Sequence, residues 1–218
     1  LTRKQSFEDI NYRDLAYMIK KRQIGYSYSA KVLFNHPKEN KSKGTKVAAF
    51  APSYKNIAPM SDYSSSTRQQ YRKRLYPLKG IKKEARRITG IIQGDVFSAE
   101  HATERRFKQT SAQYDILHLA MHTLVNDQNP MYSKMAFTQK ATTNEDGFLN
   151  TYEIYGLNLN SRMAVLSACN TGTGKLKKGE GLISLARGFK YAGCPSIVMT
   201  MWPVEDNSSI RLMEYFYQ

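Results

Sequence analysis

The stretch MAVLSACNTGTGKLKKGEGLISLARGFKYAGCPSIVM, residues 163–199, holds two short apolar runs with a polar loop and an amphipathic segment between them. Within the amphipathic segment, apolar residues recur at i, i+3, i+4 and i+7, namely Leu182, Leu185, Ala186 and Phe189. This spacing predicts a helix with one apolar face. The flanking runs lack polar alternation, which is typical of strands buried on both faces. The stretch therefore predicts a strand–helix–strand unit of a parallel sheet.

The same alternation continues on both sides of this unit. Further strands are predicted at 24–28, 46–52, 114–122, 135–138 and 196–202. Helices are predicted at 82–93, 98–109 and 151–157 and near the end of the chain. Ser98 is the expected N-cap of the second helix, and the first helix would bury one face made of Ala85, Ile88, Ile91 and Ile92. The pattern predicts an α/β fold with a mostly parallel central sheet and helices on both faces.

The chain has 218 residues, of which 41% are hydrophobic and 23% charged. We expect a single domain over 1–218, with a mobile loop or insertion at the polar, aperiodic residues 53–76. The chain starts at Leu1 and ends at Gln218 inside a helical pattern. We therefore expect truncation at both ends. No segment has the length and apolar character of a membrane span, so no membrane partner is expected.

The formal net charge is +15, and the basic residues occur in separate clusters. Such a surface attracts nucleic acid or an acidic partner. The alternative is a lysine-rich solvated surface, because the clusters are scattered and carry no known nucleic-acid motif. Both interpretations stay open at this point.

The glycine-rich loop after Cys169 resembles a phosphate-binding loop only in part. That motif requires Gly-x-x-x-x-Gly-Lys followed by Ser or Thr. Counted back from Gly174, the first glycine would stand at the position of Cys169, and Lys175 is followed by Leu176. The sequence therefore argues against a nucleotide site.

A metal site is not expected either. His118 and His122 are four residues apart, but in a strand this spacing does not bring the two rings together. The two cysteines, Cys169 and Cys194, do not have the spacing of metal ligands. We expect no metal and no cofactor. Two cysteines also do not make a disulfide framework, which favours a reducing compartment and a cytoplasmic location.

A cysteine and a histidine remain as candidates for chemistry. His122, Cys169 and Trp202 each follow a predicted strand, and ligands of open α/β sheets bind at the carboxyl ends of the strands. His122 precedes Cys169 by 47 residues, near the interval of about 50 residues between the two catalytic residues of caspases. A histidine beside a cysteine lowers the thiol pKa and later protonates the leaving amine. The alternative is that Cys169 is a small core residue; His118, inside its strand, is interpreted as structural.

The segments YDILHLAMH, SACNTGTG, GEGLISLARGFKYAG and MWPVED, in this order, resemble the CHAT domain. This caspase-like family belongs to the clan that also holds separases and gingipains, and it is often fused to tetratricopeptide repeats. The resemblance implies a caspase-like three-layer sandwich and a cysteine endopeptidase. Cys169 matches the nucleophile and His122 the general base and acid. No third member of a triad is evident.

The resemblance also suggests how a substrate is held. The backbone amides of Cys169 and Thr123 are candidates for the oxyanion hole, although the family commonly has glycine at the second position. Ser167 is expected to line the primary pocket. Clan members that cleave after Arg or Lys use a carboxylate there, and the acidic candidates are Asp146, Glu205 and Asp206. Each has a structural alternative, since Asp206 suits a helix N-cap and Asp146 a turn with the glycine that follows.

The loop behind Cys169 is the expected site of control. Its glycines, among them Gly172 and Gly174, allow backbone conformations forbidden to other residues. Glu180 opens the next helix, where its charge favours the helix dipole. We expect an activation loop gated by a fused or bound sensor such as tetratricopeptide repeats. The second hypothesis is a catalytically silent interaction module with a basic surface for nucleic acid or an acidic partner.

Overall fold

The computed structural model describes residues 11, 14–22, 45–55, 75–139, 145–167, 180–200 and 206–218. The chain forms two compact units, Leu1–Lys38 and Glu39–Gln218. In the first unit, the described part contains the short 3-10 helix η3 (Met18–Lys20). All strands described below belong to the second unit, and so does the candidate site.

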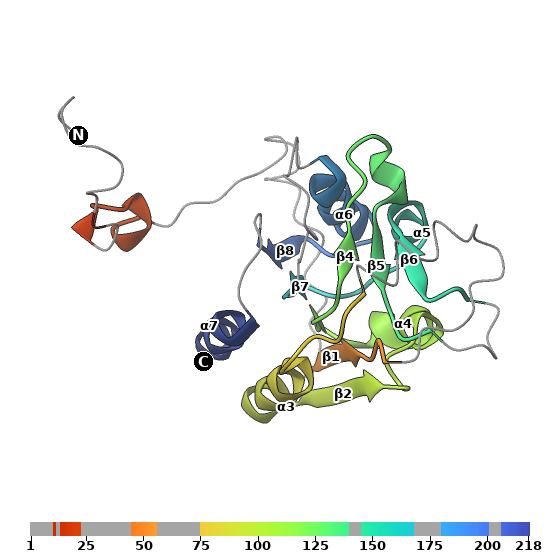
Figure 1. The fold of residues 1–218 in the computed structure, drawn as a ribbon, viewed down its shortest axis with the longest axis horizontal. Coiled ribbons are helices and arrows are strands. Elements are labelled where there is room, and N and C mark those ends of the chain that lie inside the picture. The colour runs from red at the N-terminus through yellow and green to blue at the C-terminus, as the bar shows by residue number, and fades with distance from the viewer. Residues whose placement is uncertain are drawn as a thin grey trace. The chain divides into compact units, whose positions relative to one another are not determined.

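A five-stranded parallel sheet, in the order β2-β1-β3-β7-β8, forms the centre of the second unit (Figure 1). The strands are β1 (Val47–Pro52), β2 (Gly94–Ala99), β3 (Ile116–Leu119), β7 (Met163–Leu166) and β8 (Ser196–Met199). The predicted α/β fold with a mostly parallel sheet is confirmed. The inner strands β1, β3 and β7 are short and almost wholly buried, as the apolar runs predicted.

Helices cover both faces of this sheet (Figure 1). They are α3 (Ile81–Ile91), α4 (Glu104–Thr110), α5 (Thr151–Tyr155), α6 (Glu180–Tyr191) and α7 (Asp206–Tyr217). Phe50, Leu117 and Leu166 pack on one face with side chains of α4, α5 and α6. On the other face, strand residues such as Ala49 and Val165 pack with α3 and α7. This arrangement is the three-layer sandwich expected from the sequence.

A second, antiparallel sheet in the order β4-β5-β6 stands beside the carboxyl end of β3. Its strands are β4 (Thr123–Leu124), β5 (Lys134–Ala136) and β6 (Phe148–Asn150), with the 3-10 helix η5 (Pro130–Tyr132) between the first two. Another 3-10 helix, η4 (Ser111–Gln113), follows α4. Because only three residues separate the end of β3 from the start of β4, the chain passes from one sheet to the other through residues 120–122.

Two sequence predictions about helices are wrong. Ser98 lies within β2, and the N-cap of α4 is Thr103, whose hydroxyl accepts a hydrogen bond from the backbone of Arg106 across 3.2 Å. Ile91 is 38% exposed, and Ile92 follows the end of α3. The buried face of α3 is instead made of Ile81, Glu84, Ala85 and Ile88.

Several predicted elements are shorter than expected or fall outside the described residues. The run at 114–122 supplies only the four residues of β3, and the run at 135–138 forms β5 one residue earlier. The predicted strand at 24–28 lies outside the described residues, as do 56–74 of the predicted loop. At the two described ends of that loop, Tyr54 and Leu75 are buried in one apolar cluster with the small sheet.

Candidate active site

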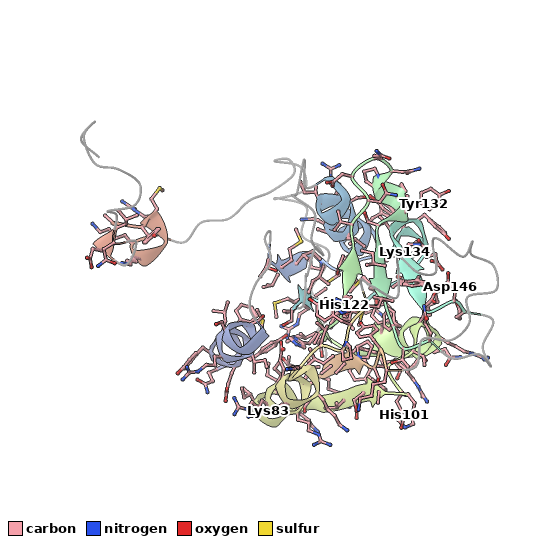
Figure 2. The ribbon with its side chains drawn as sticks, in the orientation of Figure 1. Lys83, His101, His122, Tyr132, Lys134 and Asp146 are labelled. Carbon is pink, nitrogen blue, oxygen red and sulfur yellow. The ribbon has the colours of Figure 1, made fainter. Side chains whose placement is uncertain are left out.

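His122 lies where the chain passes from the parallel sheet to the small sheet (Figure 2). β3 and β7 are parallel neighbours in register, with Leu119 opposite Leu166. His122 is the third residue after Leu119, and Cys169 is the third after Leu166. Cys169 lies outside the described residues, and so does Trp202. In the sequence, the two predicted residues thus follow the paired ends of adjacent strands by the same number of residues.

The ring of His122 is fixed by two tyrosines. The side chain is 1% exposed, and its ring centroid lies 4.8 Å from that of Tyr54 and 4.7 Å from that of Tyr76. Its Nε2 atom lies 2.7 Å from the carbonyl oxygen of Tyr76. Because a carbonyl oxygen can only accept, Nε2 carries the hydrogen. A neutral ring in this state has its lone pair on Nδ1, the atom able to accept a proton.

The hydroxyl of Tyr54 joins His122 to the small sheet. It donates to the carbonyl of Ala136 across 2.7 Å and accepts from the backbone N–H of His122 across 3.1 Å. Burial raises the pKa of Tyr54 well above its usual range, so the hydroxyl keeps its proton. Sequence reasoning missed Tyr54 and Tyr76, because both fall in the aperiodic segment 53–76. The Tyr76 contact also uses a backbone atom, which leaves no mark in the sequence.

Thr123, predicted to contribute to an oxyanion hole, directly follows His122 and starts β4. Its side chain is 1% exposed, and its hydroxyl oxygen is buried without a hydrogen-bond partner in the described part of the chain. A polar group is thus available beside His122 in addition to the backbone amide.

Ser167, predicted to line the primary pocket, is 1% exposed at the end of β7. Its hydroxyl donates to the carboxylate of Glu84, and its carbonyl accepts from the hydroxyl of Ser209 across 3.3 Å. Glu84 also contacts the ring of His118, the histidine predicted to be structural. The pocket role of Ser167 stays a prediction.

Among the acidic substrate-binding candidates, the structure describes the side-chain contacts of Asp146 alone. Asp146 is exposed, and its carboxylate accepts from the backbone N–H of Phe148 across 2.8 Å in the turn before β6. Figure 2 shows it apart from His122. Asp206 is the first residue of α7. Glu205 lies outside the described residues. Their part in binding substrate stays a prediction.

The predicted activation loop is described only at its far end. Gly172 and Gly174 lie outside the described residues, and Glu180 is the first residue of α6. The next residue, Gly181, donates its backbone N–H to the carboxylate of Asp127 across 3.2 Å. Asp127 belongs to the connection between β4 and β5. The start of α6 is therefore tied to the segment that follows His122 and Thr123.

One group of carboxylates in the described structure has the spacing of metal ligands, formed by Glu104, Glu145 and Glu153. The ammonium of Lys108 lies 2.7 Å from Glu104 and 2.9 Å from each of the other two. Burial raises the pKa of Glu104 to about 8. Hydrogen bonding to Lys108 lowers the pKa of Glu145. The chain's own cation thus occupies the position that a metal ion would take.

None of the helices in the described part of the chain is both long and apolar enough to cross a membrane.

Comparison with known proteins identifies the family. The model of the CHAT domain matches residues 5–218. The chain is 22% identical over 172 residues to tetratricopeptide repeat protein 28 of Mus musculus, and 23% identical over 172 residues to the protein of the same name from Homo sapiens. Each match covers 65% of this chain and 7% of the relative. The chain thus spans a small part of the length of these relatives.

Proposed function

The chain belongs to the CHAT domain family, which is caspase-like, and on this premise we propose that it is a cysteine endopeptidase with Cys169 as nucleophile and His122 as general base. The observation that carries the proposal is the fixed state of His122. Its Nε2–H donates to the Tyr76 carbonyl, so the lone pair of the neutral ring is on Nδ1. The equal offsets of His122 and Cys169 from paired strand residues support a contact between the two side chains.

In the proposed reaction, His122 takes the proton of the Cys169 thiol. The thiolate sulfur then attacks the carbonyl carbon of the substrate, a C–S bond forms, and the π electrons move onto the oxygen. The imidazolium gives its proton to the amide nitrogen as the C–N bond breaks and the amine leaves. Water, deprotonated by His122, cleaves the thioester and releases the new carboxylate and the free thiol. No cofactor is required.

The oxyanion is proposed to be held by the backbone amides of Cys169 and Thr123. Removing a single donor of this kind costs roughly 3 kcal/mol of transition-state stabilisation. The hydroxyl of Thr123, buried and without a hydrogen-bond partner in the described structure, is proposed as a further donor at the same site. Thr123→Val keeps the shape and removes the hydroxyl. A fall in turnover with little change in stability is the result expected if that group faces the oxyanion.

The proposed substrate is a partner protein cleaved after Arg or Lys. The proposal assigns the carboxylate of the primary pocket to Asp146, Glu205 or Asp206, with Ser167 lining the pocket. Such a carboxylate would pair with a basic side chain through charge-assisted hydrogen bonds. Because the protein's own charge is +15, the recognition of a basic residue requires a local acidic group rather than the overall field.

Control of the enzyme is proposed to act through the loop that joins Cys169 to α6. Glu180 is the first residue of α6, and the carboxylate of Asp127 accepts from the backbone N–H of Gly181. The helix dipole stabilises a negative charge at this end of a helix. A sensor such as the tetratricopeptide repeats named in the relatives would act on this loop. The protein is proposed to act in the cytoplasm, where thiols stay reduced. Glu180→Ala is expected to keep the fold and lose most activity; unchanged activity would refute this mode of control.

The experiment that tests the proposed function uses peptidyl chloromethylketones, which alkylate an activated active-site thiol. Reagents with Arg, Lys or Asp at the first position are incubated with the protein, and the modified cysteine is identified by mass spectrometry. We expect Cys169 to react with the Arg and Lys reagents, whereas Cys194 stays unmodified because it is fully buried and its pKa is raised to about 12. Labelling should be lost in His122→Ala and retained in the control His101→Ala, since His101 is an exposed histidine.

Other outcomes would contradict parts of the proposal. Preferred reaction with the Asp reagent would refute the basic primary pocket and leave the peptidase in place. Equal, slow labelling of Cys169 and Cys194 in the wild type and in His122→Ala would refute the peptidase. That result, together with salt-dependent binding of generic nucleic acid, would favour the catalytically silent module.

A further inference from the structure

A cluster of buried polar side chains lies beneath the end of β7, on the face of the sheet covered by α3 and α7. It consists of Glu84 from α3, His118 from β3, Ser167 after β7 and Tyr217 from α7, and we call it the Glu84 cluster. The first three are between 0% and 3% exposed, and Tyr217 is 7% exposed. Four elements far apart in the sequence thus meet through polar groups at one buried point.

A single carboxylate oxygen joins two of these groups to Glu84. The Oε1 atom of Glu84 accepts from the hydroxyl of Ser167 and lies 3.1 Å from Nε2 of His118. On the other side of the ring, the hydroxyl of Tyr217 lies 3.2 Å from Nδ1. Every side chain of the cluster therefore has a partner inside it.

Burying such a cluster costs free energy that apolar side chains of similar size would not cost. Part of this cost is offset because Glu84 lies in the first turn of α3, where a negative charge favours the helix dipole. Unlike apolar contacts, the hydrogen bonds of a polar cluster fix the orientation of its side chains, because each bond restricts the positions of both partners.

Ser167 is restrained through both its side chain and its backbone. Its hydroxyl is held by Glu84 and its carbonyl by Ser209 of α7, so the first residue after β7 is fixed from two helices. Ser167 stands two residues before Cys169. Because only Ala168 separates Ser167 from Cys169 in the chain, a shift of Ser167 would displace the point from which the Cys169 segment starts.

We propose that Glu84 is a positioning residue for Cys169 and acts through the hydrogen bond that it accepts from Ser167. His118, held in turn by Tyr217, keeps the Glu84 carboxylate in place. This inference rests on the proposed function, in which His122 activates Cys169. Ser167 then positions the nucleophile in addition to lining a pocket, and His118 contributes to that positioning.

The test measures the rate at which iodoacetamide alkylates Cys169 in the folded protein at pH 7, and the pH midpoint of that reaction. Cys194 is buried and should stay unmodified, so its labelling would report unfolding of a variant. Ser167→Ala removes the donor without changing any charge. Glu84→Leu removes the acceptor, whereas Glu84→Gln keeps an oxygen that can accept from Ser167. The matched control is Ser161→Ala, because Ser161 is a buried serine before β7 whose hydroxyl donates to the carbonyl of Tyr114 across 2.7 Å.

We expect Ser167→Ala and Glu84→Leu to slow the alkylation of Cys169 about tenfold or more, since a displacement of the order of 1 Å costs up to about a hundredfold in rate at such sites. The pH midpoint should rise in both, the double variant should be no slower than the slower single variant, and Glu84→Gln should restore a rate within about threefold of wild type. Ser161→Ala should lower stability and leave both the rate and the midpoint unchanged.

Two results would overturn the inference, and they are distinguishable from failure of the proposed function. If His122→Ala slows alkylation while folded Ser167→Ala matches the wild type, Glu84 has no positioning role and the peptidase stands. If Glu84→Gln is as slow as Glu84→Leu, the hydrogen bond is not what matters. If His122→Ala itself leaves the rate unchanged, the proposed function fails and this inference fails with it.

Discussion

The side chain of His122 donates from Nε2 to the carbonyl oxygen of Tyr76 across 2.7 Å. The two residues are 46 positions apart in the chain, and the tyrosine ring also packs edge-on against the histidine ring. A carbonyl acceptor orients the imidazole and fixes its tautomer without adding a charge. The group that orients the His122 ring, which the sequence did not reveal, is thus a backbone carbonyl.

The first prediction concerns this tautomer. In protein labelled with ¹⁵N at histidine, the neutral ring of His122 should show a protonated Nε2 and an unprotonated Nδ1, because the Tyr76 carbonyl can only accept. Nitrogen chemical shifts from heteronuclear NMR measure this directly, and comparison with His122→Ala assigns the signal. A protonated Nδ1 in the neutral ring would rule out Nδ1 as the base.

A second prediction concerns Tyr54, whose hydroxyl is bonded both to Ala136 and to the backbone of His122. Tyr54→Phe leaves these two buried groups without that partner, which should lower the free energy of unfolding by about 1–3 kcal/mol. Urea denaturation measures the loss. Tyr132→Phe is the control, because Tyr132 is 52% exposed and its change should stay within about 0.5 kcal/mol. Equal stabilities for the two variants would show that the Tyr54 bonds do not hold His122.

The central fold was predictable because its strongest signals are periodic. The inner strands β3 and β7 are covered on both faces and, apart from His118, consist of apolar residues. The helix α6 repeats its apolar residues at helical spacing. β2 was missed because it is an edge strand whose residues are only partly buried and include Asp95 and Ser98. Because β2 was missed, Ser98 was predicted as the N-cap of the next helix, whereas the N-cap of α4 is Thr103, five residues later.

The site was predictable only where side chains carry the signal. His122 follows a recognisable strand, so its place could be read from the sequence. Tyr76 contributes through its carbonyl, which any residue possesses. Glu84 lies in a helix whose lysines, Lys82 and Lys83, are exposed, and only the packing of α3 on the sheet shows that Glu84 is buried.

The third prediction compares two glycines in helices. A Cβ at Gly181 would lie 2.5 Å from the hydroxyl oxygen of Ser133 and 2.6 Å from a methyl carbon of Val125, whereas one at Gly90 would meet nothing within 4 Å. Gly181→Ala should therefore lower the free energy of unfolding by about 1–3 kcal/mol. Gly90→Ala should raise it by about 0.5–1 kcal/mol, because alanine loses less backbone entropy in a helix.

Thermal and urea unfolding of both variants check this prediction. Since α6 begins directly after the loop that follows Cys169, Gly181→Ala should also slow the reaction of the protein with peptidyl chloromethylketones, whereas Gly90→Ala should not. If Gly181→Ala is as stable as wild type, the segment around Ser133 does not hold the start of α6 closely.

The fourth prediction concerns the pH dependence of stability. Burial raises the pKa of Glu104 to about 8, against about 4.3 in an unfolded chain. The folded protein therefore holds one more proton than the unfolded chain between these values. The contribution of Glu104 to the free energy of unfolding is complete below about pH 4. It is lost as the pH rises to about 8, by up to about 1.4 kcal/mol per pH unit.

Glu104→Gln cannot release this proton, so the decline in unfolding free energy between about pH 5 and 8 should flatten in that variant. Glu145→Gln is the matched control, because the pKa of Glu145 is lowered and its stabilising contribution is lost as the pH falls instead. Denaturation by urea across this pH range gives both slopes. Parallel curves for Glu104→Gln and wild type would contradict a raised pKa at Glu104.

The central claim is that His122 activates the thiol of Cys169. The most direct test is the pH profile of Cys169 alkylation in the wild type and in His122→Ala. The wild-type midpoint should lie at least about one unit below the ordinary thiol pKa of about 8.5, and His122→Ala should return it to that value. A wild-type midpoint near 8.5, unchanged in His122→Ala, would contradict the claim.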